Sequence, residues 1–183
     1  MAIDLSPDLS AQIAQLQARV PVGRRVSVDN LHLTLAFLGD QSERDLESLH
    51  EALVGLSVPP FSFDLKGLEI MGGRAPRVLC LRAEPSGGLA KLHDGVRRAA
   101  RLAGLTLERR RFRPHVTPAR FGRVLQDTEQ ARLSRFVADA GLDPACRVDV
   151  QSFSLFESVL TPERAVHHVL ADYPLSGLAN VDG

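Results

Sequence analysis

The sequence has little cysteine, no long apolar run and no low-complexity tract, and these absences limit the kind of protein it encodes. The two cysteines, Cys80 and Cys146, form no CxxC pair, so we expect free thiols in a reducing cytoplasm. No apolar run is long enough to cross a membrane, and the N-terminal stretch lacks the basic and apolar segments of a signal peptide. We therefore expect a cytoplasmic protein with no membrane partner.

The length and composition are those of a globular protein. The chain has 183 residues, of which 44% are hydrophobic and 24% are charged, enough for one domain or for two small lobes. The formal net charge is zero, but the charge is unevenly distributed. Residues 109–126 contain six arginines and no Asp or Glu, and this basic stretch surrounds the second of two motifs described below.

Helical and strand-like patterns alternate along the chain. Helix-start signals, a serine followed by proline or by aspartate three residues later, precede two of the helical patterns. Helices are predicted at 7–16, 43–56, 89–102 and 127–140. Strands are predicted at 25–38, 61–71, 77–84, 113–123, 148–158 and 165–175. This order, with its hairpin-like turns, predicts an α+β fold with antiparallel sheets.

One chemical motif occurs twice in strand-like segments. Residues 30–40 ("NLHLTLAFLGD") and 113–123 ("RPHVTPARFGR") share the string H-x-T-x-A-x-x-G when His32 is aligned with His115. The other four histidines have no Ser or Thr two residues later, so the repeat is not a product of composition. In the first segment the residues that alternate with the motif should face the core: Leu31, Leu33, Leu35 and Phe37. The repeat indicates a duplicated unit.

The histidine and threonine of each motif share one face of a strand, about 7 Å apart along it. Two such strands facing each other across a cleft would place two imidazoles and two hydroxyls around one phosphorus. In-line displacement at phosphorus needs a base on one side and an acid on the other, and paired histidines supply both near neutral pH. The threonine hydroxyls would hold non-bridging oxygens, and Arg120 would add a charge-assisted contact.

Other interpretations compete with this one. A single His-x-Thr motif on a strand is more often structural than catalytic. Only its duplication in this chain makes the catalytic interpretation the favoured one. A metal site is disfavoured because neither motif contains a carboxylate or thiol, and the adjacent His167 and His168 would point to opposite strand faces. We expect no metal and no cofactor. Arginine runs are usually solvated surface, but the position of this one just before His115 favours nucleic acid.

The two motifs and their flanking residues resemble the sequences of the 2H phosphoesterase superfamily. Within it they resemble the bacterial and archaeal RNA 2',3'-cyclic phosphodiesterases, also called 2'-5' RNA ligases. The similarity runs through nearly the whole chain and follows the family's order: "AIDL", "NLHLTLAFLGD", "RFRPHVTPARF" and "SLFESVL…YPL". The resemblance implies a single domain, residues 1–183, with two pseudo-symmetric antiparallel-sheet lobes, helices outside and a central cleft. Each lobe would carry one motif, at 32–34 and at 115–117.

The resemblance also implies metal-independent hydrolysis of RNA 2',3'-cyclic phosphate ends to 2'-phosphate ends, with reversible 2'-5' ligation as a further activity. The family pattern falls on His32, Thr34, His115, Thr117 and Arg120. We expect a monomer acting on RNA with such an end, tRNA fragments being one candidate. Two alternatives stay open: the same chemistry on a small cyclic nucleotide or an ADP-ribose cyclic phosphate, and an RNA-binding module without turnover.

The neighbours of the two histidines indicate different roles. The arginine run would lower the pKa of His115, which suits the proton acceptor that activates water. Asp29 and Asp40 flank His32 and would favour its protonated form, which suits the proton donor to the leaving oxygen. The candidate RNA contacts in the run are Arg109, Arg110, Arg111 and Arg113.

Pro118 stands where the family usually has an aliphatic residue. Because proline cannot donate to a β-ladder, we expect Thr117 and Pro118 to lie on an edge strand or at a strand end. Arg120 follows His115 by five residues and would face away from it in a flat strand. Its contact with the phosphate therefore requires a bend in this strand.

Overall fold

The computed structural model describes residues 1–73, 75–108, 111–139, 146–161 and 165–177. The helices are α1 (Pro7–Arg19), α2 (Glu43–Val54), α3 (Gly87–Leu102) and α4 (Asp127–Asp139), with a 3-10 turn η1 (Val28–Asn30). The strands are β1 (Ala2–Asp4), β2 (Arg24–Arg25), β3 (His32–Thr34), β4 (Phe61–Met71), β5 (Val78–Ala83), β6 (His115–Arg120), β7 (Cys146–Val150), β8 (Ser152–Leu160) and β9 (Ala165–Pro174). The predicted α+β class is confirmed. In the described part of the chain, no helix is both long and apolar enough to cross a membrane.

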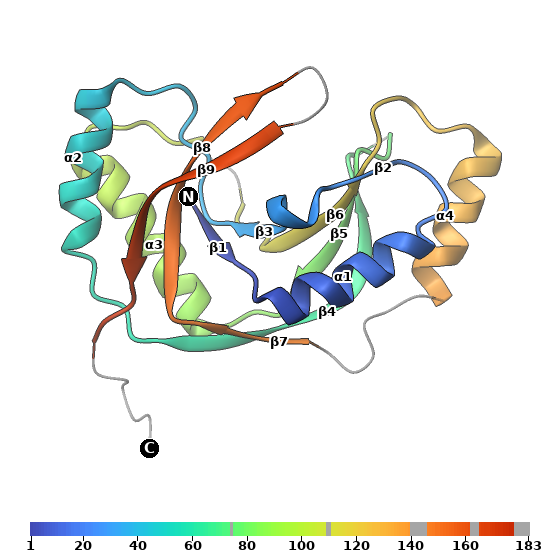
Figure 1. Ribbon diagram of the computed structural model, residues 1–183, viewed down its shortest axis with the longest axis horizontal. Coiled ribbons are helices and arrows are strands. Elements are labelled where there is room, and N and C mark those ends of the chain that lie inside the picture. Colours follow the sequence, from blue (N-terminus) through green and yellow to red (C-terminus); the bar gives the residue numbers. More distant parts are fainter. Residues whose placement is uncertain (74, 109–110, 140–145, 162–164, 178–183) are drawn as a thin grey trace.

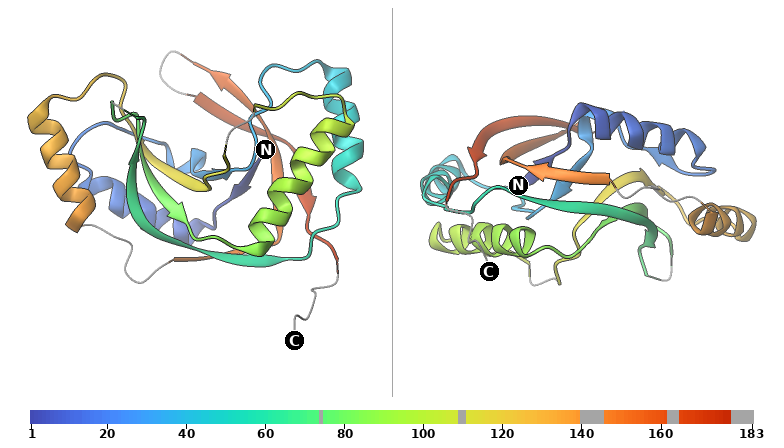
Figure 2. Two further views of the ribbon diagram at one scale, coloured as in Figure 1. Left: turned by 180° about the vertical axis from the view of Figure 1, so that it is seen from behind. Right: turned by 90° about the horizontal axis from the view of Figure 1, so that it is seen from below.

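The strands form one curved sheet, with α1 packed against β6 near its middle and the other helices toward its ends. Its path is β7-β4-β5-β6-β3-β1-β8-β9, with β2 paired to β6, and the pairings between described residues are antiparallel. The centre of the path is the contact between β6 and β3, with three further strands on each side. Helices α2 and α3 lie together at one end and α4 lies at the other (Figures 1 and 2). The division into two lobes with one motif each stays a prediction.

The helix starts follow the local signals. Ser6 precedes α1, and its side chain accepts a hydrogen bond from the backbone amide of Leu9. The apolar stripe of this helix is buried. Ser42 and Asp45 form the predicted capping box at the start of α2. The long strand expected at 25–38 is wrong: it is divided into β2, η1 and β3. The amide of Asn30 bonds to the carbonyl of Ser27, so these groups close a turn instead of extending a ladder.

The core face of β3 is confirmed in part. Three of the expected residues are at most 5% exposed: Leu31, Leu33 and Leu35. Phe37 is 80% exposed, contrary to the expectation, because β3 ends at Thr34 and the chain bends at Leu35. Both cysteines are free, as expected, and Cys80 is fully buried.

Strand β6 carries one extra residue where it passes Pro118. Leu79 pairs with Ala119 and Leu81 pairs with Val116, so three steps along β6 match two steps along β5. The expected edge strand or strand end at Pro118 is wrong, because β6 is an interior strand between β5 on one side and β3 and β2 on the other. The bulge accommodates the proline, since a residue that leaves the ladder needs no donor there.

A buried amide fixes this part of β6 to α1. Gln17 is 3% exposed, and its side-chain nitrogen donates to the carbonyls of Pro118 and Val26, both at 2.8 Å. The carbonyl of Pro118 also accepts the amide of Val26 at 2.9 Å. Both amide hydrogens of Gln17 are therefore used, next to Thr117 of the second motif.

Replacing Gln17 by Met tests this contact. Gln17→Met keeps the side-chain volume but removes both donors, so the Val26 carbonyl loses a buried partner. We expect the free energy of unfolding in urea to fall by about 1–3 kcal/mol. The matched control is Gln15→Met, which changes an exposed residue of the same helix and should have little effect. Equal stability of the two variants would mean that the amide contributes nothing.

Candidate functional site

The two motifs lie on adjacent, paired strands. Leu33 of β3 pairs with Val116 of β6 in antiparallel register, and each is the central residue of its His-x-Thr motif. One further step in each direction places His32 opposite Thr117, and His115 opposite Thr34. The expectation that the two strands face each other across a cleft is therefore wrong. They are neighbours in one sheet, and both motifs project from the same face of it.

This register sets the spacing of the four functional groups. Residues directly opposite on an antiparallel pair lie about 4.5–5.5 Å apart, and diagonal neighbours lie about 7–8 Å apart. Each histidine is therefore beside the threonine of the other motif, and the two histidines are diagonal. All four side chains are half-buried. A phosphate over the centre of the pair would have an imidazole on two opposite sides.

Both imidazoles are held by the backbone two residues earlier. Nδ1 of His115 donates to the carbonyl of Arg113 at 2.6 Å, which leaves Nε2 for another partner. His32 makes the equivalent hydrogen bond to the backbone of Asn30. Thr117 is held as well, by a hydrogen bond with the thiol of Cys80. Burial raises the pKa of that thiol to about 12, so it stays neutral.

The bulge brings Arg120 to the site. Successive residues of a strand alternate between faces, so a residue five positions after His115 would normally face away from it. The extra residue beside Pro118 reverses this alternation, and Arg120 lines the same pocket as His32 and Thr34. The bend required for Arg120 is therefore present, as a bulge in the middle of β6.

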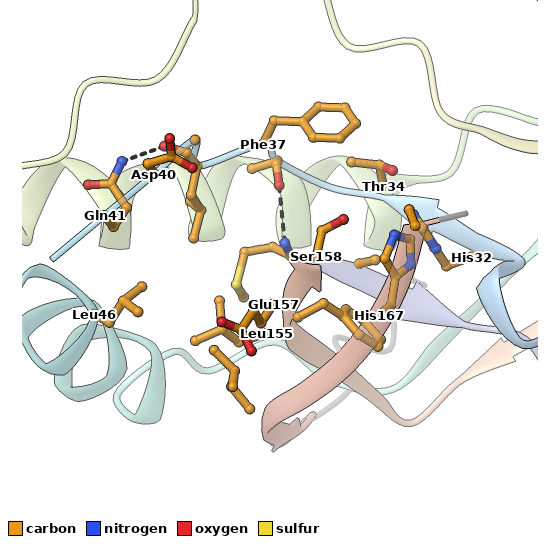
Figure 3. Close-up of a pocket in the computed structure, with 18 of the residues that line it drawn as sticks. His32, Thr34, Phe37, Asp40, Gln41, Leu46, Leu155, Glu157, Ser158 and His167 are labelled. Atoms are coloured by element: carbon orange, nitrogen blue, oxygen red, sulfur yellow. Dashed lines mark hydrogen bonds between the residues drawn. The ribbon is translucent and has the colours of Figure 1, made fainter. Parts of the chain in front are cut away.

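A pocket of about 900 Å³ opens on the first-motif side of the sheet. It lies between β3, the loop after it and the β8–β9 hairpin, and Figure 3 shows Phe37 and Asp40 on that loop. His115 and Thr117 lie outside its lining, on the neighbouring strand. Within the described residues, no group of three His, Cys, Asp or Glu side chains is placed to hold a metal ion.

The surroundings of His32 favour its neutral form. Its pKa is lowered from 6.5 to about 4, first by burial and then by the nearby His167, and the bond to the Asn30 backbone only partly opposes this. The expectation that Asp29 and Asp40 favour the protonated form is wrong. Both carboxylates are exposed, and burial beside a second imidazole outweighs them. In the free protein at neutral pH, His32 is therefore uncharged.

The arginine run is only partly available for a ligand. Arg109 and Arg110 lie outside the described residues. Arg111 is exposed, but Arg113 donates to Glu69 of β4 at 2.5 Å. The run has no acidic residue of its own. Arg113 is paired by a carboxylate from a strand far away in the sequence, and Arg123 is paired by Glu129 of α4.

Sequence reasoning did not place His167 in the site. It lies on β9, lines the pocket, and its ring centroid is 5.0 Å from that of His32 (Figure 3). The pair His167-His168 implied one imidazole on each face of a strand. Which face meets β3 depends on the pairing of β8 with β1, which is not visible in the local pattern.

Comparison with known proteins gives a consistent result. A family model described as the 2'-5' RNA ligase superfamily matches residues 5–160. An RNA 2',3'-cyclic phosphodiesterase of Thermotoga maritima is 30% identical, over 97% of this chain and 95% of its own. A protein of the same name from Escherichia coli is 34% identical, over 71% of this chain and 72% of its own.

Solved structures agree with these sequence matches. E. coli LigT complexed with 3'-AMP superposes with a TM-score of 0.79 at 27% identity, covering 96% of both chains. TT0787 of Thermus thermophilus superposes with a TM-score of 0.78 at 26% identity, with the same coverage. The similarity therefore extends over the whole fold and includes both motif strands.

The pKa of His32 predicts a pH-dependent stability. In the unfolded chain His32 binds a proton below about pH 6.5, whereas the folded protein resists protonation until about pH 4. The free energy of unfolding should therefore fall as the pH drops through this window, by roughly 3 kcal/mol for this group. Urea unfolding at a series of pH values measures the loss.

His32→Gln is the matched variant, because glutamine cannot be protonated there. Its stability should lack this part of the pH dependence, and an NMR titration of the wild-type imidazole should give a midpoint near 4. A midpoint at the ordinary value of 6.5 would contradict the buried, neutral state of His32.

Proposed function

The chain belongs to the 2'-5' RNA ligase superfamily, and from this premise we propose that it is a phosphodiesterase that opens the 2',3'-cyclic phosphate at the end of RNA. The observation that carries the proposal is the pairing of Leu33 with Val116. It places two imidazoles and two hydroxyls around one point on the sheet face. The names of the relatives support the same reaction and the same substrate class.

The reaction is an in-line displacement by water. His115 accepts a proton from the attacking water while a water oxygen bonds to phosphorus. The P–O3' bond breaks on the opposite side, and His32 donates a proton to O3'. The product ends in a 2'-phosphate and a free 3'-hydroxyl. Thr34, Thr117 and Arg120 hold the non-bridging oxygens, where negative charge increases in the transition state.

The low pKa of His32 sets a condition on this mechanism. A proton donor must be protonated when the substrate is bound, and His32 is neutral in the free protein. A phosphate anion beside the imidazole favours its charged form and raises its pKa. The substrate phosphate therefore supplies the negative charge that favours the protonated form of His32, which the exposed carboxylates do not supply. Until it binds, the buried imidazole stays uncharged.

Two finer features belong to the same proposal. Histidines act as both acid and base, so the reaction needs no metal and no cofactor. The reverse reaction, with a 5'-hydroxyl of RNA in place of water, would form a 2'-5' linkage. We propose that the protein acts as a monomer in the cytoplasm, on RNA ends that include tRNA fragments.

A small cyclic phosphate is the second candidate substrate. Arg113 is paired with Glu69, which reduces the number of arginines that are free to follow an RNA backbone. The pocket of about 900 Å³ is large enough for a single nucleotide. The chemistry would be unchanged, and only the length of the substrate would differ.

An RNA oligonucleotide with a 2',3'-cyclic phosphate end tests the activity directly. Incubation in EDTA should open the ring, and chromatography against authentic standards should identify a 2'-phosphate end. Loss of activity in EDTA, restored by a divalent cation, would contradict the two-histidine mechanism. A 3'-phosphate product would overturn the direction of attack while leaving the site intact.

Variants identify the groups responsible. His32→Ala and His115→Ala should each lower kcat by roughly 100-fold or more. Thr34→Ala and Thr117→Ala should each cost about 1.5–3 kcal/mol of transition-state stabilisation. His168→Ala changes an exposed histidine of β9 and serves as the control. Wild-type activity in either of the first two variants would rule out the proposed pair.

Salt dependence distinguishes RNA from a small substrate. Binding of a long RNA should weaken with salt more steeply than binding of a mononucleotide, because more counterions are released. Arg111→Gln should reduce the slope of log K against log salt by about 1. Arg113→Gln should reduce it less, since Glu69 competes for this guanidinium. Arg135→Gln on α4 is the control, and equal slopes for both ligands would favour the small substrate.

A further inference from the structure

We propose that His167 is a third imidazole of the site and that it binds a non-bridging oxygen of the terminal phosphate beside His32. The proposal rests on the proposed function, because it concerns the same phosphate. His167 would be a binding residue, not an acid or base of the reaction. Its position, its free ring nitrogens and the charges around it support this role.

The first argument is distance. The ring centroids of His167 and His32 lie 5.0 Å apart with an angle of 55° between the ring planes, and both residues line the pocket with Arg120. In Figure 3 the two rings lie side by side at the same edge of the pocket. An oxygen that lies between the two rings can therefore be within hydrogen-bond reach of a nitrogen of each.

The second argument is the state of the ring. His167 is half-buried, and among the described residues no hydrogen bond of its ring nitrogens is found. Its contacts there are with rings: His32, and Phe156 at 6.2 Å between centroids. The ring nitrogens of His167 are open to solvent, because no buried side-chain nitrogen or oxygen of the described residues lacks a hydrogen-bond partner. An imidazole with its nitrogens unused, in a pocket that holds a motif histidine, is suited to a ligand oxygen.

The third argument is the charge around the ring. Burial, Arg120 and the amino group of Met1 lower the pKa of His167, so the ring is neutral in the free protein. The charged or titratable groups that line the pocket with it are the amino group of Met1 and the side chains of Arg24, His32, Asp40, Arg120 and Glu157. A phosphate anion beside Arg120 reverses the balance and favours the imidazolium. His167 then binds a proton together with the anion and adds a cationic donor to the phosphate beside Arg120.

The β8–β9 hairpin explains why only one motif has this third imidazole. Ser158 pairs with His167 and Glu157 pairs with His168, so the two histidines of β9 fall on opposite faces. His167 meets β3, and His168 is exposed. On the other side of the site, Arg82 pairs with His115. The phosphate would therefore have two imidazoles on the first-motif side, with Thr34 and Arg120, and one imidazole on the other side.

Inorganic phosphate is a suitable probe, because its binding can be measured without turnover. In wild-type protein, saturating phosphate should shift the imidazole NMR signals of His167 and raise its midpoint of titration. His167→Gln should weaken phosphate binding by about tenfold or more, as expected for a lost hydrogen bond to a charged group. His168→Gln, the neighbouring residue on the exposed face, should bind phosphate like the wild type.

The outcomes separate this inference from the function on which it rests. If the wild-type protein binds phosphate but the NMR signals of His167 do not shift at saturation, the inference is overturned, and no variant is needed for this result. A folded His167→Gln protein with wild-type phosphate affinity would overturn it as well. Phosphate binding that depends on His167, in a protein that does not open the cyclic RNA end, would support the binding site and reject the proposed reaction.

Discussion

The pairing of β3 with β6 is the constraint on which the site depends. Leu33 and Val116 face each other at the centre of the sheet, and both are fully buried. Because the side-chain period of a strand is two, burying these two residues forces their neighbours to the opposite face. A shift of the pairing register by one residue would exchange the two faces of the strand that shifts. Its motif side chains would then point into the core, and its core residue would be exposed. Core packing and the geometry of the candidate site are therefore fixed by the same register.

The bulge in β6 extends this arrangement to a fifth residue. A regular strand would direct Arg120 away from His115, and a proline in an interior strand would leave a gap in the ladder. One extra residue resolves both problems, because it takes Pro118 out of the ladder and reverses the faces after it. Gln17 then supports the irregular backbone through the Pro118 carbonyl. The proline, the glutamine and the arginine form one unit, although they are remote in the sequence.

Much of the site could be predicted from local pattern, and the rest depended on long-range pairing. The alternation around His32 and His115, and the capping box at α2, involve only residues close in the chain, so they were visible in the sequence. The sequence does not contain the strand order, so it could not show that the two motif strands are neighbours. The exposure of Phe37 follows from an early end to β3. The bond between Arg113 and Glu69 likewise joins elements that the local pattern cannot pair.

The two motifs are alike in sequence, yet acid–base chemistry needs two groups that differ. A site with exact two-fold symmetry would give both histidines the same surroundings, and nothing around the rings would set one apart as donor or acceptor. The surrounding strands make the environments of the two rings unlike. His32 is covered by Phe156, with 6.0 Å between ring centroids, and by His167 from the hairpin. His115 instead has Arg82 as its partner across the sheet. The paired strands set where the two imidazoles lie, and the unlike neighbours give the two rings different surroundings.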